Sequence, residues 1–147
     1  MIEWIKMKEK KPSFHERILF FGYYENDFPE IHYGRACEEG CFPWDSSTRG
    51  VISFEQILWW SKTPFFLDAE NEWINTKEQN PIHNEMILFV AYDYDGSRDI
   101  HYGYVDEYGF NASEYGYPIV YKVEDVLCWL PIPPIPKMMD VQDKLSV

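Results

Sequence analysis

Two histidines occupy the same four-residue motif, Ile-His-Tyr-Gly, at His32 and His101. A histidine acts as a general base when a nucleophile or a carboxylate lies within hydrogen-bonding distance of its ring. The sequence supplies no such partner at a common spacing in both places. We therefore predict two strand histidines that are hydrogen-bonded to a neighbour, and we keep both as candidate binding residues because the motif occurs twice.

The three cysteines, Cys37, Cys41 and Cys128, offer little chemistry. They cannot close a disulfide framework, and an intracellular reducing compartment fits them best. Cys37 and Cys41 with the nearby His32 suggest half of a zinc site, but their spacing fits poorly and a second cysteine pair is missing. We expect no metal, no cofactor and no nucleophilic cysteine.

An acidic run, Asp-Tyr-Asp-Gly-Ser-Arg-Asp at 93–99, resembles a calcium loop at first sight. The EF-hand pattern requires glycine at its sixth position and glutamate at its twelfth, but Arg98 and Tyr104 stand there. The pair Asp95-Gly96 is a strong signal for a β-hairpin, because glycine accepts a positive φ at little cost. We predict a hairpin turn.

Tyrosine is the most promising residue type for binding, since its rigid ring and polar hydroxyl are favoured at recognition surfaces. Segment 104–117 reads as an exposed, partly apolar loop that is rich in tyrosine. Ordinary packing of this loop over a thin sheet is the alternative, and the sequence leaves both open. The candidate binding tyrosines are Tyr104, Tyr108, Tyr115 and Tyr117.

These residues belong to a chain that contains one module twice. Aligning 4–64 with 73–133 pairs 61 residues without a gap, and 21 of the pairs are identical. The identities include the Ile-His-Tyr-Gly motif and the Glu-x-Ile-Leu-Phe run at 16–20 and 85–89. Two copies of one module is therefore the firmest prediction from the sequence.

Each copy is predicted to form a meander of about three β-strands. The first run, at 17–24 and 86–92, is apolar on both faces, which is typical of a central strand covered on two sides. A helical turn is expected before the last strand. The stretches 41–53 and 110–122 match only at Val51 and Val120, so we predict a variable loop there.

We therefore expect a mainly β protein with little helix, in which two small antiparallel β-meander repeats pack as a pseudo-twofold pair. Roughly 65 residues are marginal alone, so the second apolar face of each copy should cover the other. The predicted boundaries are 1–69 for the first repeat, 70–136 for the second and 137–147 for a C-terminal tail. The proline-rich 131–136 is expected to form a strap on the protein's own tryptophans.

The net charge and the absence of common catalytic motifs exclude several classes of function. The chain has 13 Lys and Arg against 25 Asp and Glu, a formal net charge of -12. Such a field argues against direct binding to nucleic acid or to an anionic membrane face. The sequence has no phosphate loop, no Gly-x-Ser-x-Gly elbow and no His-Glu-x-x-His motif, and we expect no enzymatic activity. We also expect neither a secretory signal nor a transmembrane segment.

The second copy resembles a small domain of phages and prophage-carrying bacteria, the domain-of-unknown-function family numbered 551. The residues that carry this resemblance are Trp73-Ile74, Pro81, the Ile-Leu-Phe-Val run at 87–90, Gly103-Tyr104 and the Cys-Trp-Leu-Pro-Ile-Pro-Pro string at 128–134. Cys128 stands where members of that family usually have histidine, and the first copy is more divergent. The resemblance implies a phage or mobile-element accessory protein in a bacterial cytoplasm. It brings no catalytic residues.

The favoured hypothesis is a non-enzymatic protein-binding module, for example one that docks on a host or defence protein and inhibits it. Two alternatives stay open. One is an acidic mimic of nucleic acid that blocks a DNA- or RNA-handling enzyme, suggested by the net charge. The other is a binder of a small molecule or nucleotide signal in the groove between the repeats.

Overall fold

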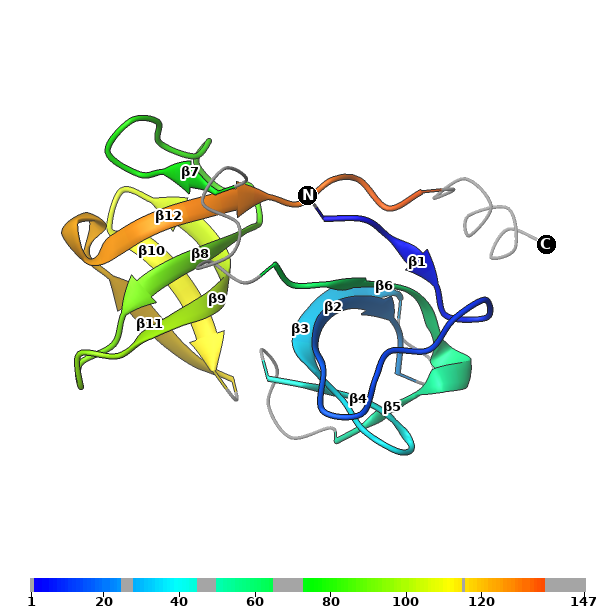
Figure 1. The fold of residues 1–147 in the computed structure, drawn as a ribbon. Helices are drawn as coiled ribbons and strands as arrows, with labels where there is room; N and C mark the ends of the chain where they lie inside the picture. Colours follow the sequence, from blue (N-terminus) through cyan, green and yellow to red (C-terminus); the bar gives the residue numbers. More distant parts are fainter. Residues whose placement is uncertain (1, 25–27, 45–49, 65–72, 115, 137–147) are drawn as a thin grey trace.

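The β-rich runs of the two copies form the central strands of two antiparallel sheets (Figure 1). The computed structural model describes residues 2–24, 28–44, 50–64, 73–114 and 116–136. The first sheet contains β1 (Ile5–Lys6), β2 (Arg17–Gly22), β3 (Glu30–Ala36), β4 (Gly40–Pro43), β5 (Ile52–Ser53) and β6 (Ile57–Lys62). The second contains β7 (Ile74–Asn75), β8 (Ile87–Tyr92), β9 (Arg98–Asp106), β10 (Gly109–Glu114), β11 (Tyr117–Tyr121) and β12 (Val126–Pro131).

The two sheets have the same topology. The first has the order β1-β6-β2-β3-β4-β5, and the second, in the same direction, β7-β12-β8-β9-β10-β11. Each has a register shift at an equivalent place, next to the pairs Gly22–Ile57 and Ala91–Val126. A short 3₁₀ turn precedes the last strand in both, η1 (Phe54–Gln56) and η2 (Val123–Asp125). The predicted helical turns are therefore confirmed.

Equivalent side chains also make equivalent bonds. The indole of Trp60 donates to the carbonyl oxygen of Lys10 at 2.7 Å, and that of Trp129 donates to the carbonyl oxygen of Gln79 at 2.9 Å. These four positions correspond in the alignment of the copies. The duplication seen in the sequence thus reappears in the register and in the hydrogen bonds.

Each sheet curls around an apolar core of its own, and the remaining apolar face of each sheet contributes to a third cluster shared by both repeats. Along β8, Ile87 and Phe89 point into the core of the second repeat, and Leu88 and Val90 point into the shared cluster. This alternation explains why the strand is apolar at every position. The shared cluster comprises Ile2, Leu19, Tyr33, Trp73, Leu88, Val90, Ile100 and Leu130.

The shared cluster draws on the same positions of both copies. Leu19 and Leu88 correspond in the alignment, and both are completely buried. Other corresponding pairs either belong to the cluster or pack on it: Trp4 with Trp73, Ile31 with Ile100, and Tyr33 with Tyr102. A contact made by one patch with its own equivalent is isologous, the signature of a twofold arrangement. The expected pseudo-twofold pair of β repeats is confirmed.

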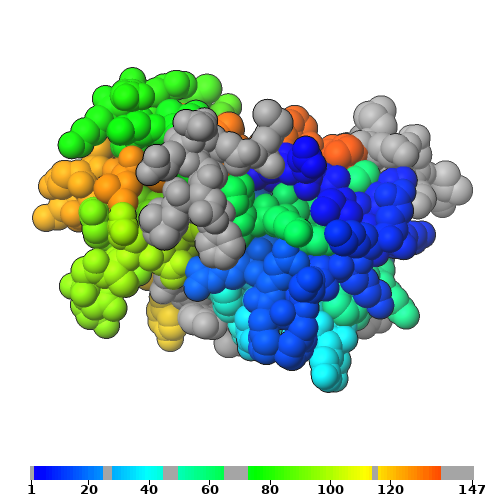
Figure 2. Space-filling view, viewed as in Figure 1, coloured from blue at the N-terminus to red at the C-terminus, as the bar shows by residue number. Residues whose placement is uncertain are grey.

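Two polar contacts also join the repeats. The indole of Trp4 donates to the carbonyl oxygen of Pro133 at 3.0 Å, which ties the N-terminal segment to the proline-rich strap. Figure 2 shows these segments, blue and orange, side by side. Arg17 of β2 pairs with Asp99 of β9 at 2.6 Å. The segment 131–136, predicted to form a strap on the protein's own tryptophans, thus bonds to one of them, Trp4, and its Ile132 packs on the shared cluster that contains Trp73.

Two expectations about the strands are wrong. Each sheet has six strands, not about three. The short opening segments pair with the last strands as β1 and β7, and the predicted variable loops 41–53 and 110–122 contribute β4 with β5 and β10 with β11. The segment 104–117 is not a loop: it contains the end of β9, all of β10 and the start of β11. The variable stretch 110–122 therefore forms a hairpin in the second repeat.

Helical structure in the described ranges is limited to the two 3₁₀ turns, and none of it is long enough to cross a membrane. The predicted boundary between the repeats and the predicted tail, 137–147, lie outside the described residues, as does the junction 65–72.

Candidate functional site

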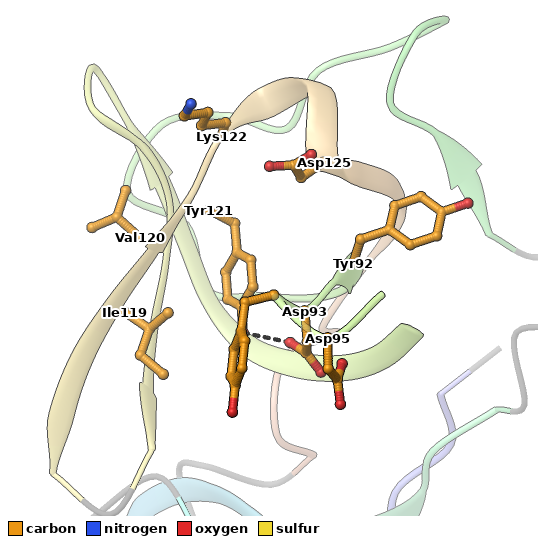
Figure 3. A pocket seen from close by; sticks show the side chains of 9 residues that line it. Tyr92, Asp93, Asp95, Ile119, Val120, Tyr121, Lys122 and Asp125 are labelled. Carbon is orange, nitrogen blue, oxygen red and sulfur yellow. Dashed lines mark hydrogen bonds between the residues drawn. The ribbon is translucent and has the colours of Figure 1, made fainter. Parts of the chain in front are cut away.

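An open groove of about 590 Å³ lies on the second repeat, between the β8–β9 turn and strand β11 (Figure 3). We call it the β8–β11 groove. It lies within one repeat and is separate from the apolar cluster that joins the two. Its lining residues are Tyr92, Asp93, Tyr94, Asp95, Ile119, Val120, Tyr121, Lys122 and Asp125.

The floor of the groove is a small network of polar side chains centred on Asp93. One carboxylate oxygen, Oδ1, accepts a hydrogen bond from the Tyr121 hydroxyl at 2.9 Å and lies 3.2 Å from Nε2 of His101. The His101 side chain is only 4% exposed, whereas that of Asp93 is 25% exposed. Asp93 therefore links a buried imidazole to the surface of the groove.

Aromatic rings hold this network in place. The His101 ring packs on Tyr121 with centroids 4.7 Å apart and on Phe89 at 5.6 Å. Phe89 is completely buried in the core of the second repeat. Since the imidazole faces this core, it has no direct access to a docked partner.

The β8–β9 hairpin brings the carboxylates to the groove, as its Asp-Gly signal predicts. The amide of Gly96 donates to the carbonyl oxygen of Asp93 at 2.9 Å, and Gly96 has a φ of 86°. The Asp95 carboxylate accepts bonds from the Ser97 hydroxyl and amide at 2.6 and 3.0 Å. These bonds lower the pKa of Asp95, with the hydroxyl as the main cause, so this carboxyl is ionised at neutral pH.

The equivalent positions of the first repeat have different chemistry. Tyr24 and Ile52 stand where the second repeat has Asp93 and Tyr121. His32 is buried like His101, and it packs near Phe20 and Tyr24 with ring centroids 5.5 and 6.3 Å away. The Tyr24 hydroxyl donates to the carbonyl oxygen of Gly50 at 3.0 Å. Tyr24 thus occupies the position from which Asp93 bonds to its histidine in the second repeat.

The structure separates the tyrosines that the sequence nominated. Tyr104 is half-buried on β9. Tyr108 and Tyr117 are 76% and 75% exposed, but they lie at opposite ends of β10, about 20 Å apart for six strand residues. Tyr115 lies outside the described residues. These side chains do not form one cluster.

Sequence reasoning missed the residues that the groove brings together. Asp93 lies in the acidic run that predicts a hairpin turn, and Tyr92, Tyr94 and Tyr121 are not among the tyrosines that the sequence nominates. A signal was available in the alignment of the copies. It pairs Asp93 with Tyr24 and Asp125 with Gln56, and so marks acidic residues that are found only in the second repeat.

Two of the three cysteines, Cys41 and Cys128, are poor nucleophiles. Burial raises the pKa of Cys41 to about 12, with a smaller contribution from Cys37, and burial raises the pKa of Cys128 to about 11. Both thiols are therefore protonated at neutral pH.

Replacing Asp93 tests the network on the groove floor. Asp93→Ala should destabilise the protein by about 1–3 kcal/mol, because the Tyr121 hydroxyl and the His101 ring lose an acceptor in a largely buried place. Asp93→Asn keeps an oxygen acceptor and should lose less than half as much. Urea denaturation followed by circular dichroism measures both. Equal losses for the two variants would show that the hydrogen bonds contribute nothing specific.

Comparison with known proteins finds no matching family model, no matching curated protein and no matching solved structure. The resemblance to the phage-associated family stays a prediction. Function must therefore be argued from the surface of the molecule itself.

Proposed function

We propose that this chain is a non-enzymatic protein-binding module and that its partner docks on the β8–β11 groove. The proposal rests on one observation, the gathering of exposed tyrosine and aliphatic side chains around an open groove. Tyr94 is fully exposed, Val120 is 52% exposed and Tyr92 is 42% exposed. Large exposed apolar side chains grouped around a concavity are typical of recognition surfaces.

The backbone beside the groove supports the same proposal. Strand β11 is the last strand of its sheet and pairs with β10 alone among the described strands. An edge strand presents backbone donors and acceptors to which an extended peptide can add. Pro118 in this strand has no amide hydrogen, which leaves the residues from Ile119 to Tyr121 as the part suited to pairing.

The proposed cellular location and the proposed kind of partner are inferred from the sequence. The resemblance to a phage-associated domain suggests a bacterial cytoplasm and a host protein as the partner. The acidic net charge of -12 is unfavourable for direct contact with nucleic acid or an anionic membrane.

Capture experiments with matched variants test the proposal. The tagged full chain is expressed in its native host, crosslinked in the cell, and the captured proteins are quantified by mass spectrometry. Tyr94→Ala and Val120→Ser should each reduce capture of one particular protein at least about fivefold, because truncating a contact residue costs about 1 kcal/mol or more. Both side chains are exposed, so the fold is retained.

Phe14→Ala is the control, because it removes a 58% exposed aromatic ring from the first repeat. Capture by this variant should equal that of the unmodified chain. A partner that is retained equally by all three variants, or the absence of any specific partner, contradicts the proposal.

A further inference from the structure

We infer that the β8–β11 groove recognises a positively charged segment of its partner and takes an arginine side chain between the exposed ring of Tyr94 and its carboxylates. This inference rests on the proposed function and specifies the chemistry of the partner. It follows from the charges, the rings and the size of the groove.

The charges that line the groove are predominantly negative. Asp93, Asp95 and Asp125 stand against a single cation, Lys122 (Figure 3). The Asp95 carboxyl has a lowered pKa and therefore keeps its charge at neutral pH. Asp93 and Asp95 each accept hydrogen bonds from within the second repeat through Oδ1, so a ligand would meet the second carboxylate oxygen of each, together with the carboxylate of Asp125. A cation gains from this field, whereas a phosphate or carboxylate is repelled.

The aromatic side chains favour arginine among the cations. Of the three tyrosines that line the groove, Tyr94 is fully exposed and offers a ring face for stacking. The Tyr121 ring already packs on His101, and the Tyr92 ring points away from Asp93 and Asp95 (Figure 3). A guanidinium group is planar and weakly hydrated, so it stacks on an aromatic face while its N–H groups pair with a carboxylate. A lysine ammonium is more strongly hydrated and has no planar group of N–H donors. It therefore gains less binding free energy from the same tyrosine ring and carboxylates.

The size of the groove suits a side chain with its flanking backbone. Its volume of about 590 Å³ lies within the range of about 300–1,000 Å³ that ligand pockets span. One wall is strand β11, whose outer edge has no partner strand in the described part of the chain. An extended segment can therefore lie along β11 while its arginine enters the groove.

The first repeat provides an internal contrast. Its residues at the positions of Asp93, Asp125 and Lys122 are Tyr24, Gln56 and Ser53. None of these three is charged at neutral pH, although the fold of the two repeats is the same. Over all nine lining positions the first repeat has a single charged residue, Glu25 at the position of Tyr94, whereas the second has three aspartates and one lysine. The cluster of three carboxylates is thus specific to the second repeat.

The test uses the peptide acetyl-Gly-Arg-Gly-Arg-Gly-amide as the probe and the full chain as the receptor. Nuclear magnetic resonance titration should shift the signals of Tyr94, Val120 and Asp125. Replacing both arginines of the peptide by citrulline, which has nearly the same shape without the charge, should weaken binding at least about tenfold. Equal binding of the two peptides would overturn the inference.

Variants of the protein locate the site. Asp125→Asn should weaken binding of the probe about fivefold, and Lys122→Gln should strengthen it about threefold, because one removes an attractive charge and the other a repulsive one. Glu55→Gln changes the net charge like Asp125→Asn but lies on the exposed η1 turn of the first repeat, and should have no effect. Equal weakening by Glu55→Gln and Asp125→Asn would mean general attraction to an acidic protein and would overturn the inference.

The two proposals fail separately. If the cellular partner is lost with Tyr94→Ala while the citrulline peptide binds as well as the arginine peptide, protein binding stands and the arginine inference falls. If the groove binds the probe as described but captures no partner in the cell, the proposed function falls.

Discussion

Gly103→Ala is expected to prevent stable folding of the second repeat. Gly103 lies on β9 opposite Ala112 of β10, and a methyl group built on its Cα would overlap the backbone carbonyl of Asn111. A flexible side chain can move away from such a clash, but a carbonyl inside a paired strand cannot move without breaking the ladder. The free energy of unfolding should therefore fall by at least about 3 kcal/mol.

The first repeat allows the same test at an equivalent position. Gly34 would direct its methyl group at the carbonyl of Phe42 in β4, so Gly34→Ala should be similarly damaging. Gly96→Ala is the control: Gly96 has a φ of 86°, and the space around it is open. That substitution should cost only about 1 kcal/mol. Urea denaturation measures all three, and a loss at Gly103 no larger than that at Gly96 would contradict the close packing of these strands.

The sequence was sufficient to predict the duplication and the pairing of the repeats, for a physical reason. A strand such as the one containing Leu88 and Phe89 is apolar on both faces only if both faces are covered, and one small repeat covers only one of them. The second face therefore had to pack on another surface, and the other copy supplied a matching one.

The variable segment was harder to predict, because the comparison of the copies hid its turns. Gly109 has a φ of 133°, and the Asp106 carboxylate accepts a bond from the amide of Tyr108 at 2.9 Å. This is an ordinary turn signal. It was outweighed by the poor match between the copies, which indicated a loop. The copies diverge here although both pair strands in this stretch, β4 with β5 and β10 with β11.

The floor of the groove was beyond prediction from one sequence. Asp93 and His101 lie eight residues apart in the same β8–β9 hairpin, but the Tyr121 hydroxyl comes from a position 28 residues away from Asp93. Only the path of β11 beside β10 brings these residues together. The spacing of the three residues in the sequence has no recognisable period, so no motif could report it.

Leu88→Ala tests the contact between the repeats and should have the second large effect. Leu88 is completely buried in the shared cluster, where its equivalent, Leu19, is completely buried too. Truncating a leucine in such a place costs about 2–5 kcal/mol. Leu19→Ala should cost a similar amount, although each residue belongs to a different repeat. The double variant should differ from the sum of the two by about 0.5 kcal/mol or more, because both enlarge one cavity.

The same variant distinguishes a single cooperative unit from two independent ones. Trp60 and Trp129 are equivalent residues in the cores of the first and second repeats, so fluorine labels on the two indoles report each repeat separately. If the shared cluster stabilises both, Leu88→Ala lowers the unfolding midpoint of both labels by the same amount. Ile82→Ala, at a 67% exposed side chain, should leave both midpoints unchanged. A lowered midpoint for Trp129 alone would mean that each repeat is stable without the other, and the apolar second faces of β2 and β8 would then lack their physical explanation.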